Sequence, residues 1–176
     1  MDFKGRLSRF KRTQTKEECK YFPKDKNELL SIIKPMIKKD STCDLNDVWV
    51  GDITDMDYLF SGAKFNGDIS RWDVSNVKTM YGMFYTCTFN GDISSWDVSN
   101  VEDMMYTFHK SKFNGDISSW NVSNVLYMNG MFEKSPFNGD ISSWNVFHVR
   151  NMSCMFLDCP LENNTPKWYK YYIGAF

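Results

Sequence analysis

The 176-residue sequence lacks any long hydrophobic run. Nothing in it approaches the ~20 apolar residues that cross a bilayer, and its N-terminus lacks the apolar core of a signal peptide. These absences predict a protein without a membrane span that is intracellular or associated with a larger assembly.

Histidine is scarce, and the cysteines follow no regular spacing. The two histidines, His109 and His148, and the five cysteines form no Ser–His–Asp set, Cys–His pair or paired-cysteine zinc motif. The odd number of cysteines also argues against a disulfide framework. We therefore expect a protein that is not an enzyme and has no catalytic residues, cofactor or metal.

The net charge of −1 conceals an uneven distribution. Residues 1–39 contain 12 Lys and Arg against 5 Asp and Glu, whereas the remainder contains 9 against 17. Residues 1–20 are predicted to be a flexible basic arm. The alternative is a weak, salt-sensitive contact with an acidic surface, without specific nucleic-acid recognition. Its cations would be Lys4, Arg6, Arg9, Lys11 and Arg12.

A 24-residue repeat dominates the remaining sequence. It occurs four times, as Phe65–Phe84, Phe89–Phe108, Phe113–Phe132 and Phe137–Phe156. A period of this size is typical of stacked supersecondary units. We predict a repeat solenoid over residues 48–160, consisting of an opening half-repeat and four copies. A helical cap over 21–47 would precede it, with an amphipathic helix at ~25–39. A decayed half-repeat and cap would follow over 161–176.

Each copy predicts a strand and a helix. Asn66-Gly67 is a turn signal, and the alternation around Trp72 and Val74 favours a short strand. The spacing of the apolar residues over 77–84 is helical, and Asn76 would cap the helix N-terminus. The predicted fold class is an α/β repeat solenoid with one short parallel strand and one short helix per repeat.

An aspartate also recurs at the same position of each copy: Asp68, Asp92, Asp116 and Asp140. Each could accept hydrogen bonds from the backbone of its own turn, or the row could bind cations as in calcium-binding solenoids. Hard cations such as calcium are coordinated by about six or more oxygen ligands, and one carboxylate per turn supplies too few. We favour the turn interpretation.

The string FNGDISSWDVSNV, followed by the methionines and phenylalanine, resembles the repeat of the BspA-like family, also known from a domain of unknown function in mycoplasma surface lipoproteins. The lead-in from Pro23 resembles that family's helical entry segment, so the likeness covers residues ~22–160. It implies a leucine-rich-repeat-like solenoid, adhesion or protein–protein contact, and a surface location. The family has no catalytic residues to carry over.

The positions that vary between copies predict where a partner would bind. Solenoids recognise partners through such exposed positions, and interfaces favour aromatic and apolar groups. The candidate partner surface is Lys78, Tyr81, Tyr85, Met105, Tyr106, Leu126 and Tyr127. The alternative is ordinary surface variation.

The sequence therefore predicts a non-enzymatic protein–protein interaction module. The alternative function is a structural component of an assembly, such as a virion or envelope, docked through its basic arm and end caps.

Overall fold

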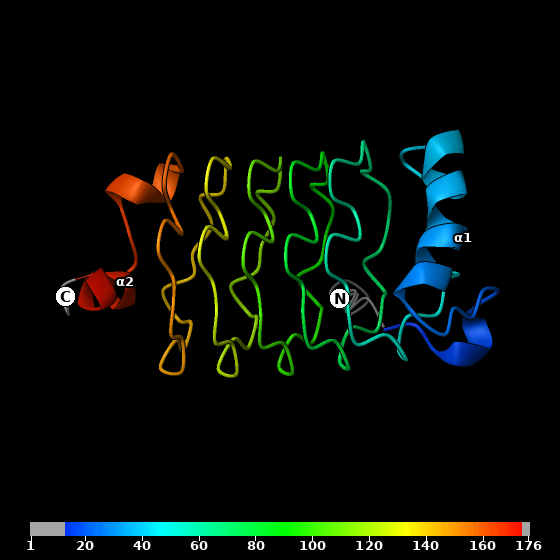
Figure 1. Ribbon diagram of the computed structural model, residues 1–176, viewed down its shortest axis with the longest axis horizontal. Coiled ribbons are helices and arrows are strands. Elements are labelled where there is room, and N and C mark those ends of the chain that lie inside the picture. The colour runs from blue at the N-terminus through cyan, green and yellow to red at the C-terminus, as the bar shows by residue number, and fades with distance from the viewer. Residues whose placement is uncertain (1–12, 174–176) are drawn as a thin grey trace, which may run out of the picture.

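The computed structural model describes residues 13–173 of the chain. In that range the chain contains two α-helices, α1 (Lys26–Lys39) and α2 (Lys167–Ile173), and two 3₁₀ turns, η1 (Lys16–Glu18) and η2 (Pro160–Asn163). Between them the backbone winds into coils that lie side by side along the longest axis, with α1 at one end and α2 at the other (Figure 1).

The predicted α/β fold, with a strand and a helix in each repeat, is wrong. Within residues 13–173 the repeats contain neither element, and extended pairing is limited to isolated parallel bridges. One row of bridges joins successive coils at a spacing of 24 residues: Asp55–Thr79, Thr79–Asp103, Asp103–Tyr127 and Tyr127–Asn151. The repeats are therefore stacked in register, but each is built from turns.

Left-handed residues explain why the segment over 77–84 is not a helix. Gly82 has a φ of 57° and Thr86 a φ of 54°. A right-handed helix cannot continue through a residue with left-handed backbone angles. Here a second left-handed residue follows the first after four residues. The other coils repeat the pair, at Tyr58 and Gly62, Tyr106 and Lys110, Gly130 and Lys134, and Cys154 and Asp158.

The backbone hydrogen bonds of this segment alternate between two kinds of partner. The Met83 N–H donates to Met80 O within its own turn, at 3.0 Å. The Gly82 N–H instead donates to Met105 O in the next coil at 2.8 Å, and the Phe84 N–H donates to Thr107 O at 2.9 Å. Every second N–H thus bonds across coils, so the backbone is satisfied without either regular element.

The expected strand around Trp72 is also replaced by a turn, in which the Trp72 N–H donates to Ile69 O at 3.1 Å. The Trp72 indole Nε1–H donates to Leu45 O of the preceding coil at 2.9 Å. Four other tryptophans donate in the same way to the carbonyl 27 residues earlier: Trp96, Trp120, Trp144 and Trp168. The tryptophans therefore both fill the core and link neighbouring coils.

The prediction that Asn76 caps a helix is wrong for the same reason, since no helix follows it. Its side-chain Nδ2 donates to Gly51 O of the preceding coil at 2.8 Å. Asn100 and Asn124 donate likewise to Ser75 O and Ser99 O. These asparagines contribute to stacking between coils.

Two columns of phenylalanine rings run through the core. The first contains Phe60, Phe84, Phe108, Phe132 and Phe156, and the second Phe65, Phe89, Phe113 and Phe137. Within the first column, neighbouring rings are 5.4–6.1 Å apart between centroids and nearly parallel. Pairs between the columns are closer, at 4.1–4.7 Å. Stacked aromatic pairs add stabilisation beyond their burial.

Helix α1 confirms the helix predicted for residues ~25–39. It begins after Asp25, whose carboxylate accepts from the Asn27 and Glu28 N–H groups at 2.8 and 2.9 Å. Leu29 and Ile33 are fully buried and belong to the same core as the coils. The helix therefore covers the apolar end of the stack. Neither helix in residues 13–173 is long and apolar enough to span a bilayer.

Replacing Trp120 with Phe should lower the free energy of unfolding by about 2–4 kcal/mol. The change leaves the buried Ile93 carbonyl without its donor and removes buried volume. Trp49→Phe is the matched control, because that indole donates to the exposed Asp52 carboxylate. Urea unfolding measures both, and equal losses would contradict the assigned role of the Trp120 hydrogen bond.

Candidate functional site

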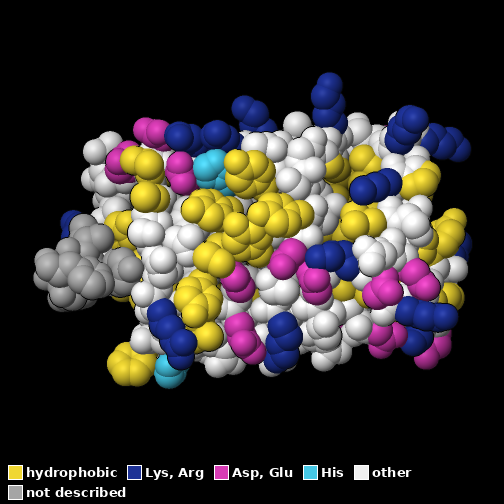
Figure 2. Space-filling model, in the orientation of Figure 1, with side chains coloured by type: hydrophobic (Ala, Val, Ile, Leu, Met, Phe, Trp, Pro, Cys, Tyr) yellow, Lys and Arg dark blue, Asp and Glu magenta, His cyan; other side chains and the backbone are white. Residues whose placement is uncertain are grey.

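A hollow of about 500 Å³ lies on the surface of the coils. Hydrophobic side chains gather over the middle of one face, beside a histidine (Figure 2). The residues that line the hollow are Tyr58, Ser61, Tyr81, Tyr85, Tyr106, His109 and Glu133. We refer to this feature as the tyrosine hollow.

Two of its tyrosines lie in a left-handed column that alternates with glycine. Tyr58 and Tyr106 have φ values of 57° and 54°, and the intervening members are Gly82 and Gly130. A Cβ atom on Gly82 would lie 2.6 Å from Tyr58 Cε1, and one on Gly130 would lie 2.3 Å from Tyr106 Cε1. Each tyrosine ring thus lies against the backbone of the next coil, in space that only glycine leaves open.

The aromatic rings of the hollow stand mostly at right angles. Tyr81 meets Tyr58 at 76° and Tyr106 at 84°, with centroids 4.9 and 5.9 Å apart. Tyr106 meets His109 at 81°, whereas Tyr85 stacks on His109 at 7° and 4.7 Å. Hydrogen bonding with Tyr58 and burial raise the pKa of the Tyr81 hydroxyl. The tyrosine rings form walls in different planes around one space.

A buried imidazole and a carboxylate complete the lining. His109 is only 6% exposed, and its Nδ1 lies 3.4 Å from Glu133 Oε2 but makes no hydrogen bond. Burial lowers the pKa of His109, opposed by the charge of Glu133 and assisted by Lys110 and Lys134. Lys134 Nζ lies 3.3 Å from Glu133 Oε1. The imidazole is therefore neutral at pH 7, and Glu133 is the one acidic group in the lining.

The structure brings together three of the seven residues of the predicted partner surface: Tyr81, Tyr85 and Tyr106. The other four residues of that surface do not line the hollow. Lys78 is exposed, whereas three are half-buried: Met105, Leu126 and Tyr127.

Sequence reasoning missed four residues of the hollow: Tyr58, Ser61, His109 and Glu133. Tyr58 belongs to the degenerate opening half-repeat, and a shift of 24 aligns it with Gly82. His109 and Glu133 share the variable column of Tyr85. A search of that column for polar as well as aromatic residues would have found them.

The recurring aspartates act as turn acceptors. Asp68 Oδ1 accepts from the Ser70 N–H at 2.8 Å, and the equivalents Asp92, Asp116 and Asp140 accept from the N–H two residues on, at 2.9–3.0 Å. These hydrogen bonds lower the pKa of Asp116 and Asp140. Across the described part of the chain, no three acidic, histidine or cysteine side chains group in a way that could hold a metal ion.

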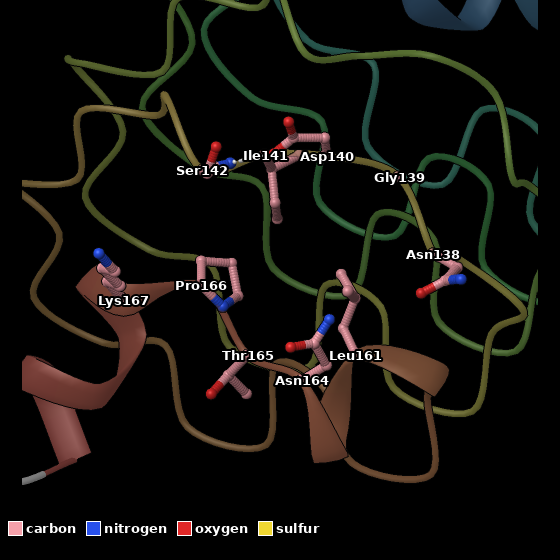
Figure 3. A pocket seen from close by; sticks show the side chains of 10 residues that line it. All are labelled: Asn138, Gly139, Asp140, Ile141, Ser142, Leu161, Asn164, Thr165, Pro166 and Lys167. Atoms are coloured by element: carbon pink, nitrogen blue, oxygen red, sulfur yellow. Dashed lines mark hydrogen bonds between the residues drawn. The ribbon is translucent and has the colours of Figure 1, made fainter.

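A second hollow, of about 440 Å³, lies where the last half-repeat meets the final complete coil. Asp140 and Ser142 lie on one side of it, and Asn164 to Pro166 on the other (Figure 3). The Asp140 carboxylate is bonded within its own turn. Asp140 is the one acidic side chain in the lining of this hollow.

The basic residues expected to contact an acidic surface, Lys4 to Arg12, lie outside the described residues. The remainder of the expected arm lies against the first coils. Gln14 is buried, and its Nε2 donates to Asn46 O and Val48 O at 3.1 and 3.0 Å. The alternative role in an assembly, docked through the basic arm of residues 1–20 and the end caps, stays a prediction.

Comparison with known families finds a match over most of the chain. A family model described as "Mycoplasma protein of unknown function, DUF285" matches residues 34–112 and 106–171. Together these ranges cover most of the chain, and they confirm the mycoplasma-type repeat family expected from the sequence. Neither a curated protein nor a solved structure matches the chain.

Replacing Gly82 with Ala should destabilise the fold and displace Tyr58. The cost combines about 1–2 kcal/mol for a left-handed L-residue with the clash against the Tyr58 ring. Gly62→Ala is the matched control, because its φ is 69° but the nearest atom lies 3.9 Å from an added Cβ. Chemical unfolding should show a larger loss in the free energy of unfolding for Gly82→Ala than for Gly62→Ala. Equal losses would mean that the Tyr58 ring moves aside without a measurable cost.

Lowering the pH should destabilise the native protein partly through His109. The unfolded imidazole gains its proton near pH ~6.5, whereas the folded one gains it only at lower pH. The stability associated with the neutral imidazole is therefore present above pH ~6.5 and falls as the pH drops below it. Urea unfolding at pH 7.5 and 5.5 should show that the free energy of unfolding falls less between these pH values in His109→Phe than in wild type. The exposed His148→Phe variant should behave like wild type, and a His109→Phe variant that does the same would contradict this assignment.

Proposed function

The chain belongs to the family of Mycoplasma proteins of unknown function, DUF285, and from its surface we propose that it is a non-enzymatic protein-binding module. The observation that carries this proposal is the tyrosine hollow, in which Tyr81, Tyr85 and Tyr106 converge. Repeated residues build the frame of stacked coils, and residues that differ between copies line the hollow.

The chemistry of the hollow suits a protein partner. Tyrosine is enriched at interfaces and at the positions that contribute most to binding, since a rigid ring adds contact area and its hydroxyl bonds to polar groups. The three tyrosines are only partly buried, so their remaining surface is available for contact. Tyr58 extends the surface and is 49% exposed.

The BspA-like resemblance adds a finer proposal. If the chain shares the role implied by that likeness, its partner is a protein bound during adhesion, and the protein acts at a cell surface. The repeat string over Phe65–Phe156 and the helical lead-in support this version.

Simultaneous replacement of Tyr81, Tyr85 and Tyr106 by Ala should abolish partner capture without unfolding the protein. These side chains line the hollow, whereas the phenylalanine columns and tryptophan hydrogen bonds of the core stay intact. The measurement is affinity purification from the native source followed by mass spectrometry, with circular dichroism to verify folding.

The matched control replaces three aromatics that lie outside the hollow and are exposed: Tyr21, Phe22 and Phe147. This variant should capture the same partner as wild type. Unchanged capture by the hollow variant, or equal loss by both variants, would refute the assignment of the binding surface.

A further inference from the structure

Three tyrosines of the hollow contact neighbouring rings at steep angles and not in parallel stacks: Tyr58, Tyr81 and Tyr106. Tyr58 and Tyr106 each meet Tyr81 edge to face rather than in a stack, so these contacts cover part of the ring surface and the rest borders the hollow. The phenylalanine columns of the core behave in the opposite way, since their rings are nearly parallel and close-packed. The hollow is therefore a partly open enclosure of aromatic walls.

Aromatic walls of this kind attract organic cations. The face of a tyrosine ring carries partial negative charge and attracts a cation within about 6 Å of its centroid. A hollow of about 500 Å³ accommodates a trimethylammonium group or the end of a lysine or arginine side chain.

The polar groups of the lining favour positive over negative ligands. Glu133 is 14% exposed at its side chain, and its Oε2 faces the neutral His109. Burial depresses the pKa of His109, so the imidazole adds no positive charge at pH 7. Its Nδ1 is buried and lies 3.4 Å from Glu133 Oε2, so the imidazole fixes one side of the carboxylate and leaves the negative charge of the lining on Glu133.

Two lysines lie close to Glu133 and must be included in the charge balance. Lys134 approaches the other carboxylate oxygen, Oε1, from an exposed position, and Lys110 is exposed. The Lys134 side chain is 42% exposed and that of Glu133 only 14%, so a cation held inside the hollow would compete with Lys134 for the same carboxylate. Beyond residue 39 the chain carries 17 Asp and Glu against 9 Lys and Arg, which also favours a basic partner.

We propose that the tyrosine hollow binds an organic cation, with the rings of Tyr58, Tyr81 and Tyr106 enclosing it and Glu133 balancing its charge. In the natural complex the cation is a lysine, arginine or methylated lysine side chain of the protein partner. This inference rests on the proposed function for its biological ligand, but the site itself is testable with small molecules alone.

The decisive probe pair is choline and 3,3-dimethylbutan-1-ol, which have the same shape but differ in charge. Titration of each into the full chain, followed by the NMR signals of the tyrosine rings, should show choline binding about tenfold more tightly. Equal binding of the two would overturn the proposal, because shape alone would then explain it. Preferential binding of a neutral sugar such as glucose would also overturn it.

Variants assign the site within the chain. Glu133→Gln should weaken choline binding severalfold, and Tyr106→Leu should weaken it further, whereas Tyr106→Phe retains the ring face and should bind nearly as wild type. Thermal unfolding verifies that each variant is folded. Unchanged binding by both Glu133→Gln and Tyr106→Leu would place the cation elsewhere and refute the proposal.

Three further ligands distinguish the sources of the cation: N-acetyl-lysine amide, its trimethylated form and N-acetyl-arginine amide. Competition of the preferred ligand with the captured partner would link the cation site to the proposed function. If none of the cations binds but the alanine variant still loses its partner, the cation proposal fails while the binding surface stands. If choline binds but the alanine variant still captures the partner, the cation site stands and the proposed partner surface fails.

Discussion

The hydrogen bonds that join each coil to the next are the constraint on which the rest of this structure depends. Around Gly82 and Phe84, every second backbone N–H donates to a carbonyl 23 residues further along the chain. This spacing fixes the register, so equivalent side chains of successive repeats must lie above one another. The aromatic columns, the tryptophan hydrogen bonds and the asparagine contacts all require that alignment. An unpaired backbone group in the interior is costly, which makes slippage between coils unfavourable.

Much of the architecture could be predicted from the sequence. The 24-residue period identified the repeating columns, and the apolar spacing over residues ~25–39 identified α1. The secondary structure inside the repeat could not be derived in this way. The apolar spacing of Val77, Met80 and Phe84 suits a helix, but turns with a pair of left-handed residues, four apart, place the same residues in the core. Glycine marks that position only at some copies, and Tyr106 or Lys110 occupies it elsewhere, so the signal is hidden.

The candidate site shows the same division. Variation between copies identified Tyr81, Tyr85 and Tyr106, because positions free of core packing differ from repeat to repeat. Variation alone does not reveal which of these positions converge. The contact between Tyr58 and Gly82 depends on how far a ring reaches across the stack, and the Tyr85 ring that stacks on His109 comes from the preceding coil. Such relations arise from packing between coils and have no signature along the chain.

The uniform junction between coils also has an evolutionary consequence. Because each coil contacts its neighbours through nearly the same bonds, unequal recombination could add or delete a 24-residue unit and leave every remaining junction intact. The tyrosine hollow would not survive such an event between residues 58 and 133, since its walls come from four coils in a fixed order, from Tyr58 to Glu133. Length can therefore change in a descendant lineage without loss of the fold, whereas recognition is tied to one particular succession of units.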